Sequence, residues 1–250
     1  MRHELKYRIN HHQSEILRQK LSRILEKDPN MGSNGYYNIR TLYFDDYRNS
    51  AFHEKRSGLY WRKKYRLRMY NHCDNLIKFE RKEKINNFTR KEAVKITRSE
   101  AEKIISGNIG FLAYSKHRLL REFYVEARCK LIRPVVLVEY ERVAFIHSVG
   151  HVRVTFDTNL RTNLGQVSFF DENISTMSVP EVPGEILEIK YNEVLPKYIR
   201  GVFTDTIPLQ LATSKFELCR ERDYKLAGCL LKLPRCTTLV HRTRVPIIYR

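Results

Sequence analysis

The sequence predicts an α+β fold in which antiparallel strands close into a tunnel, with helices packed outside. Charged and apolar residues alternate along several strand-like segments, which gives each strand one charged face and one apolar face. Segments with helical spacing separate two groups of strands. If helices cover the apolar faces, the charged faces must point inward. The tunnel is therefore expected to be lined with basic residues.

Size and charge limit the classes of protein to which the chain can belong. The chain has 250 residues and 42% hydrophobic content, enough for one full-sized core. Lys and Arg total 46 against 28 Asp and Glu, and the net charge of +18 favours nucleic acid, anionic membranes or phosphate compounds as partners. The five cysteines form no C-x-x-C pair, which argues against a structural zinc site and favours the reducing cytoplasm. No apolar run is long enough for a transmembrane segment, and the charged start is not typical of a signal peptide.

The first half of the chain alternates strands with one helix. Residues 2–9 alternate with the period of a strand, and residues 14–26 place apolar side chains at helical spacing before a turn at Asp28-Pro29. The elements that follow are a strand at 36–45, a polar loop at 46–58, and a hairpin of strands 59–70 and 76–85.

The second half opens with two helices. Thr97 and Glu100 form a capping box for a helix that ends near Gly107, and a longer helix spans 115–132 before Pro134. Three strands are predicted at 135–146, 151–157 and 185–191, and a final helix at 211–226, ended by Gly228. These elements predict one domain over 1–228 and an unassigned basic tail over 229–250.

One strand carries four cations on one face. Arg62, Lys64, Arg66 and Arg68 occupy alternate positions of strand 59–70. A solvated outer face would explain such a row, because antiparallel sheets often have one wet side. However, the opposite face is apolar apart from a single lysine, and similar charged faces recur on the neighbouring strands. This recurrence favours an inward-facing row.

Acidic residues stand among these cations: Glu4, Glu80, Asp157 and Glu188. Nucleic-acid binding is the main competing use of a basic surface, but such a groove gains nothing from carboxylates. A divalent cation that bridges carboxylate and phosphate oxygens does require them. Trp61, Tyr65 and Phe79 are expected to pack in the core rather than to stack on bases. Phosphate compounds are therefore the expected partners, and nucleic acid is not.

Eight short motifs along the chain carry a family resemblance: 2–7 (RHELKY), 41–45 (TLYFD), 64–70 (KYRLRMY), 79–82 (FERK), 139–142 (EYER), 153–157 (RVTFD), 187–191 (LEIKY) and 214–216 (SKF). In this order they resemble the VTC domain, the polyphosphate polymerase domain of the CYTH-like or triphosphate tunnel metalloenzyme superfamily. The resemblance implies a tunnel of about eight antiparallel strands. It also implies phosphoryl transfer from ATP to a growing chain of inorganic polyphosphate.

The resemblance also implies roles for particular residues. The catalytic cations would be Arg66, Arg68, Lys82, Arg142, Arg153 and Lys215. Further contacts with the phosphate chain would come from Lys6, Arg40, Lys78, Tyr140 and Ser214. The faces of Arg40 and Lys78 depend on the strand register, which the sequence leaves open. Glu188 would hold Mn²⁺ or Mg²⁺, whereas Arg2 stands where many superfamily members have the first Glu of a Glu-x-Glu-x-Lys pattern.

Two alternatives stay open at this stage. A tripolyphosphatase or nucleoside triphosphatase of the same superfamily would share the phosphate-binding residues and use water as the acceptor. A polyphosphate- or RNA-binding module without turnover would need the cations but no metal. Oligomeric state and protein partners are not predicted.

Overall fold

One antiparallel sheet forms the centre of the molecule. The computed structural model describes residues 2–86, 88–163, 168–179, 184–204 and 214–232. In spatial order the strands are β1 (Arg2–Ile9), β10 (Glu185–Asn192), β8 (Val152–Thr162), β7 (Arg133–His147), β3 (Tyr37–Asp45), β4 (Trp61–Tyr70), β5 (Cys73–Ile85) and β6 (Phe88–Ile96). Two short strands extend it, because β2 (Glu26–Lys27) pairs with β7 and β9 (Met177–Ser178) pairs with β8.

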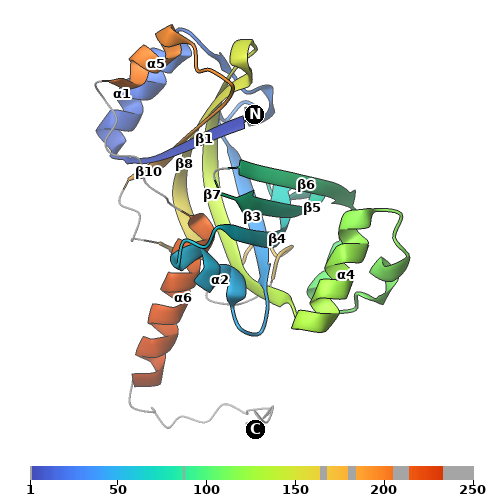
Figure 1. The fold of residues 1–250 in the computed structure, drawn as a ribbon. Helices are drawn as coiled ribbons and strands as arrows, with labels where there is room; N and C mark the ends of the chain where they lie inside the picture. The colour runs from blue at the N-terminus through green and yellow to red at the C-terminus, as the bar shows by residue number, and fades with distance from the viewer. Residues whose placement is uncertain (1, 87, 164–167, 180–183, 205–213, 233–250) are drawn as a thin grey trace.

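The sheet curls into a half-barrel, so the fold is α+β (Figure 1). The curl brings the first strand of the path back toward the last ones. Glu4 on β1 accepts hydrogen bonds at 3.0 and 3.1 Å from the Lys82 ammonium on β5. Within the described residues the strand path starts at β1 and ends at β6 without backbone pairing between these two strands.

Six α-helices within the described residues lie around the sheet: α1 (His11–Ser22), α2 (Ser50–Arg56), α3 (Arg98–Ile105), α4 (Arg118–Lys130), α5 (Lys197–Thr204) and α6 (Lys215–Lys232). In Figure 1, α1 and α5 lie together beyond β1 and β10, and α4 lies beside β5 and β6. The helices α2 and α6 contact each other at the other end of the curl. None of the helices within the described ranges is long and apolar enough to cross a membrane.

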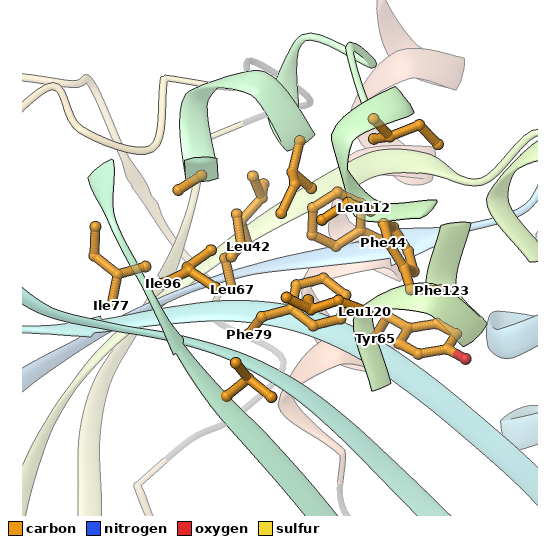
Figure 2. Packing of buried hydrophobic residues seen from close by; sticks show 14 of the residues in the cluster. Leu42, Phe44, Tyr65, Leu67, Ile77, Phe79, Ile96, Leu112, Leu120 and Phe123 are labelled. Atoms are coloured by element: carbon orange, nitrogen blue, oxygen red, sulfur yellow. The ribbon is translucent and has the colours of Figure 1, made fainter. Parts of the chain in front are cut away.

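The largest core cluster joins α4 to the outer face of the sheet (Figure 2). The Phe123 ring on α4 lies 4.7 Å from the Phe79 ring and 5.0 Å from the Tyr65 ring, measured between centroids. Phe44 on β3 completes the group, 5.6 Å from Phe123. Each buried aromatic side chain of this kind contributes about 1.5–3 kcal/mol. The apolar faces of the strands therefore point outward, against helices, as the alternating pattern predicts.

The charged faces point the other way. Leu67 and Met69 are buried in the outer core, while Arg66 and Arg68 of the same strand line the hollow of the curl. Lys63 is the one cation of the outward row, and the carboxylate of Glu126 on α4 binds its ammonium. The predicted division of this strand into two faces is confirmed.

Three of the longer elements are missing from the sequence prediction. The strand β6 follows directly on the predicted hairpin and forms the end of the sheet. The helix α2 lies within the predicted polar loop 46–58, and α5 lies where no element is predicted. The capping box of Thr97 and Glu100 is confirmed at the start of α3.

Two details of the prediction are wrong. Trp61 is 47% exposed, whereas Tyr65 and Phe79 are buried as expected, because Trp61 begins β4 beyond the cover of α4. The last helix does not end at Gly228, since α6 continues to Lys232. Residues 211–213 of that predicted helix and residues 233–250 of the predicted tail lie outside the described residues.

Candidate active site

Two adjoining cavities fill the hollow of the curled sheet. Their volumes are about 500 and 580 Å³. The walls that they share come from β1, β4, β5, β6, β7 and β10, and consist of Glu4, Arg66, Arg68, Lys82, Thr89, Arg142 and Lys190. Five of these seven residues are cations and come from strands far apart in sequence. The curl thus gathers positive charge at the junction of the two cavities.

Most of the predicted site residues meet here. The first cavity is lined by Lys6, Arg66, Arg68, Lys82, Tyr140, Arg142, Glu188, Ser214 and Lys215. The second adds Lys78 and Arg153 to the shared cations. Ser214 and Lys215 belong to the start of α6, which closes one end of the first cavity.

Arg40 is the exception, because it lines neither cavity. Its side chain is almost fully buried and donates hydrogen bonds to the carbonyl oxygens of Phe169 at 3.3 Å and Asp171 at 2.5 Å. Its guanidinium also lies 3.3 Å from Glu139 Oε2. Thr41, the next residue on β3, faces the hollow and accepts from Arg68 at 3.3 Å. Strand alternation therefore turns Arg40 outward, and it anchors a surface loop instead.

Two of the acidic residues hold cations in place. Asp157 accepts from both Nε and Nη2 of Arg142, at 2.6 and 2.7 Å, and lies 2.5 Å from Lys215 Nζ. Glu80, whose side chain is 0% exposed, accepts from Arg66 Nε at 2.7 Å and lies 2.6 Å from Lys91 Nζ. Burial alone would raise the pKa of Glu80, but the neighbouring cations lower it to about 2. Both carboxylates stay ionised and fix the cations beside them.

The other two acidic residues form a pair with a lysine between them. Lys6 Nζ lies 2.9 Å from Glu4 Oε1 and 3.5 Å from Glu188 Oε1. This arrangement follows from the antiparallel register of β1 and β10, in which Lys6 stands opposite Glu188 and Glu4 opposite Lys190. Burial acts to raise the pKa of Glu188, but the ammonium groups of Lys190 and Lys6 hold that pKa well below its usual range. The pair therefore presents two carboxylates to the cavity.

A glycine sets this register. Gly184 precedes β10 with φ of +94°, and a Cβ built there would lie 2.1 Å from the Ile9 carbonyl oxygen at the end of β1. Only glycine combines that backbone conformation with so close an approach. The start of β10 is thereby fixed against the end of β1, and Glu188 is placed across from Lys6.

The carboxylate pair suits a divalent cation. Mg²⁺ and Mn²⁺ prefer oxygen ligands, and Mg²⁺ usually binds through one or two carboxylates together with water and substrate phosphates. Glu4 and Glu188 supply such a donor set at the wall of the first cavity. Among the described residues no cluster of three or more His, Cys, Asp or Glu is arranged to hold a metal ion. The remaining ligands would come from the substrate and water.

Several further residues line the cavities. Arg62 and Lys64 line the first cavity, as the inward-facing row of cations predicts, and Lys84 and Lys190 there share strand parity with the predicted site residues. Lys55, Lys91 and Thr89 come from α2 and β6, the elements that the sequence did not reveal.

At the far end of the second cavity, Arg153 lies 2.6 Å from Asp28 Oδ2 and donates to Tyr37 Oη at 2.6 Å.

Two cavity lysines have lowered pKa values. Burial, and then the nearby Lys55 ammonium, lower the pKa of Lys64 to about 7. Lys64 Nζ lies 4.2 Å from the centroid of the Phe216 ring and 3.5 Å from Ser214 Oγ. Burial and Lys6 lower the pKa of Lys82 to about 8. A polyanion that enters the cavity would favour the charged form of both lysines.

We expect the affinity for a phosphate chain to depend on pH through these lysines. Below the pKa each lysine is charged and attracts phosphate, and above it the attraction is lost, so affinity should fall as pH rises through 7 to 8. Calorimetric titration with tripolyphosphate over this range measures the effect. In Lys64→Arg the side chain keeps its charge at every pH, so the affinity of this variant should depend less on pH than the parent's does. The titration of tripolyphosphate itself contributes equally to both proteins. Identical profiles for the variant and the parent would contradict the assignment.

The chain is similar to several solved structures, of which the first named here shares the fold. A putative adenylyl cyclase from Hippeastrum, described as having a dominant triphosphatase activity, is 15% identical with a TM-score of 0.56, and the match covers 89% of this chain and 96% of that one. A Pyrococcus horikoshii OT3 protein is 15% identical with a TM-score of 0.47, covering 89% and 99%. A putative adenylate cyclase from Bacillus halodurans is 10% identical with a TM-score of 0.44, covering 94% of each chain.

The family is shown by sequence rather than by these distant structures. A search of curated protein sequences found no match to the chain. A family model described as the VTC domain matches residues 1–222 of the 250. The match spans every strand of the sheet and the start of α6, and agrees with the eight motifs. The chain therefore belongs to the VTC domain family.

Proposed function

We propose that this domain transfers the γ-phosphoryl group of ATP to the end of a growing inorganic polyphosphate chain. One observation supports the proposal most directly. The shared cations, the carboxylate pair and the start of α6 all lie around one hollow. Membership of the VTC domain family supports phosphoryl chemistry on triphosphates. The choice of a polymerase reaction is our inference.

The binding site in this proposal is a closed tunnel lined with basic residues. The two cavities share their central walls, which supports one continuous passage with a mouth at each end. Lys64 and Lys215 stand toward one mouth, and Lys78 and Arg153 toward the other. A linear phosphate chain would thread between them, with Arg66, Arg68 and Arg142 around its middle. Regularly spaced anionic groups match this lining better than a compact ligand does.

The roles of the chain's own residues follow from their positions. Arg68, Lys82 and Arg142 would contact the equatorial oxygens of the transferred group and neutralise the charge that spreads over them. Tyr140 Oη accepts from Arg142 at 3.4 Å and orients it, and Ser214 would donate a hydrogen bond at the mouth. Lys6 would remain between the two carboxylates. Charged groups fixed before the substrate arrives need little reorganisation in the transition state.

The reaction needs no nucleophile from the protein. A terminal oxygen of the acceptor chain would form a bond to the γ-phosphorus of ATP, while the bond from that phosphorus to the bridging oxygen of ADP breaks. Mn²⁺ or Mg²⁺, when held by Glu188 and Glu4, would withdraw charge from phosphate oxygens. The cations at the junction would hold donor and acceptor in line, which is the main requirement of phosphoryl transfer.

Hydrolysis of a triphosphate is the second candidate, since the structure with the TM-score of 0.56 is described as having a dominant triphosphatase activity. Water would then replace the acceptor chain at the same site.

The products separate these functions. With ATP and Mn²⁺ we expect polyphosphate and ADP, resolved by gel electrophoresis and by phosphate assay. Phosphate release without polymer would favour the triphosphatase, and tight binding of polyphosphate or RNA without turnover would favour a non-catalytic module. Arg40→Lys is a matched control, because it keeps a cation at a site that lines neither cavity. A product pattern that this control alters as much as cavity variants do would contradict the site.

A further inference from the structure

An exposed apolar patch lies at one end of the strands β4, β5 and β6. Its members are Leu59, Tyr60, Trp61, Ile85 and Phe88, with exposed fractions of 51, 63, 47, 39 and 52%. They make up five of the fifteen large hydrophobic side chains that are exposed within the described residues. Single exposed hydrophobic residues are ordinary, but a third of them gathered at one place indicates an interaction surface. We refer to these five residues as the apolar tip.

The strand register places three of the five tip residues side by side. Trp61 on β4 pairs with Ile85 on β5, and Ile85 pairs with Phe88 on β6, so the three side chains share one face. The amide of Asn86 donates at 2.9 Å to the carbonyl of Tyr60 and holds the start of β4 against the end of β5. The tip therefore spans three strands, at the turn of the β5–β6 hairpin and the open end of the β4–β5 hairpin.

Cations stand directly behind the apolar tip. Arg62 and Lys84 pair across β4 and β5 one residue farther along each strand, about 3 Å behind the tip at the usual strand rise. Neither has a carboxylate within ion-pair distance among the described residues. On the outer face, Lys63 lies 5.4 Å over the Trp61 ring and binds Glu126, while Trp61 Nε1 donates to Glu83 Oε1 at 2.7 Å. Arg90, opposite Glu83, adds another exposed cation.

We propose that the apolar tip docks on the surface of an anionic lipid bilayer. Tyr and Trp favour the boundary between hydrocarbon and headgroups, because each has an apolar ring and a polar edge. Lys and Arg just behind such rings attract anionic headgroups. Arg62 and Lys84 stand at that level, one residue behind Trp61 and Ile85. The arrangement matches an end-on approach of these three strands.

Charge decides between a bilayer and a second copy of this chain. A twofold contact through the tip would bring the same cations face to face, which opposes association. An anionic bilayer complements them, and the net charge of +18 adds long-range attraction. Arg62 and Lys84 also line the first cavity, so docking would set the mouth of that cavity against the lipid headgroups.

The single tryptophan of the chain, Trp61, reports directly on the docking. With vesicles of phosphatidylcholine and phosphatidylglycerol we expect co-sedimentation and a blue shift of the tryptophan emission. Vesicles of phosphatidylcholine alone should give neither, and high salt should weaken the binding. The double variant Tyr60→Ser/Phe88→Ser keeps the reporter and should lose on the order of tenfold or more in vesicle affinity.

Tyr198→Ser is the matched control, since Tyr198 is 53% exposed on α5, away from the tip. It should bind vesicles as the parent does. None of the five tip residues lines either cavity, so the double variant should keep the parent's turnover in the absence of vesicles. Absence of a blue shift with anionic vesicles, or equal binding by the double variant, would overturn the proposal. A dimer that the double variant abolishes, without vesicle binding by the parent, would assign the tip to self-association instead.

Discussion

Replacing Glu188 with Gln should abolish metal-dependent turnover while tripolyphosphate still binds. The variant keeps the shape of the side chain but removes one of the two carboxylate charges at the candidate metal site. Lys190 at 3.0 Å and Arg142 at 3.7 Å lose an anionic neighbour and remain available to phosphate. Loss of a metal contact that acts in the transition state is worth several kcal/mol, so the rate should fall by about 100-fold or more. Steady-state rates with Mn²⁺ and calorimetry with tripolyphosphate measure the two effects.

A neighbouring carboxylate supplies the control for this experiment. Glu141 on β7 accepts from the Asn159 side chain at 2.8 Å and lines neither cavity, so Glu141→Gln should keep the parent's rate. Glu188 also holds cations, and breaking a buried ion pair destabilises a fold by about 3–5 kcal/mol. If Glu188→Gln melts many degrees earlier yet keeps its Mn²⁺-dependent rate when folded, Glu188 is structural and the metal site lies elsewhere.

Arg68→Ala should weaken tripolyphosphate binding and leave the melting temperature almost unchanged. Arg68 lies in the shared wall of both cavities, and within the described residues its side chain donates one hydrogen bond, the 3.3 Å contact to Thr41 Oγ1. Loss of a charge-assisted contact costs about 1.5–3 kcal/mol, which is roughly a 10- to 150-fold loss of affinity. Calorimetry and thermal melts of the ligand-free protein test both parts.

Arg66→Ala makes the matched comparison. From the sequence, both arginines share one face and both variants are expected to fold normally. In the structure Arg66 binds the fully buried Glu80 at 2.7 Å and donates to Tyr43 Oη at 3.0 Å, so its removal leaves Glu80 with Lys91 alone. Arg66→Ala should therefore lose stability as well as affinity. If both variants bind tripolyphosphate as the parent does, the cation row does not contact the substrate.

The alternation of charged and apolar residues along the strands was enough to predict most of the fold. On β4 the step from Tyr65 to Arg66 separates core from cavity, and a period of two residues is enough to predict it. The pattern does not reveal register, so the outward turn of Arg40 became visible only once Thr41 and Tyr43 were placed opposite the arginines of β4. The position of Glu4 and Glu188 on either side of Lys6 likewise depends on the register of β1 and β10.

Capping by carboxylates that stand before the usual N-cap position explains the missed helix α2. Its preceding residue, Asn49, has φ of 56° and makes no side-chain cap. The cap comes from Asp45 at the end of β3, whose carboxylate accepts from the amides of Ala51 at 2.9 Å and Phe52 at 3.1 Å. A local capping signal is therefore absent from the sequence. Because Lys55 lies on α2, its place in the wall of the first cavity was not predicted either.

The carboxylates fixed among the cations also limit how strongly a polyanion can be held. A passage lined by cations alone would bind a long phosphate chain so tightly that the chain could hardly move. Glu80 and Asp157 lie behind the wall, bound to Arg66 and Arg142, and there they offset part of the attraction at each step. A channel conducts only when its ligand can leave each binding position as well as enter it. Under the proposed function, these two acids would let the product advance by one phosphate after each transfer. Neutralising them should therefore raise the affinity for polyphosphate and shorten the product chains.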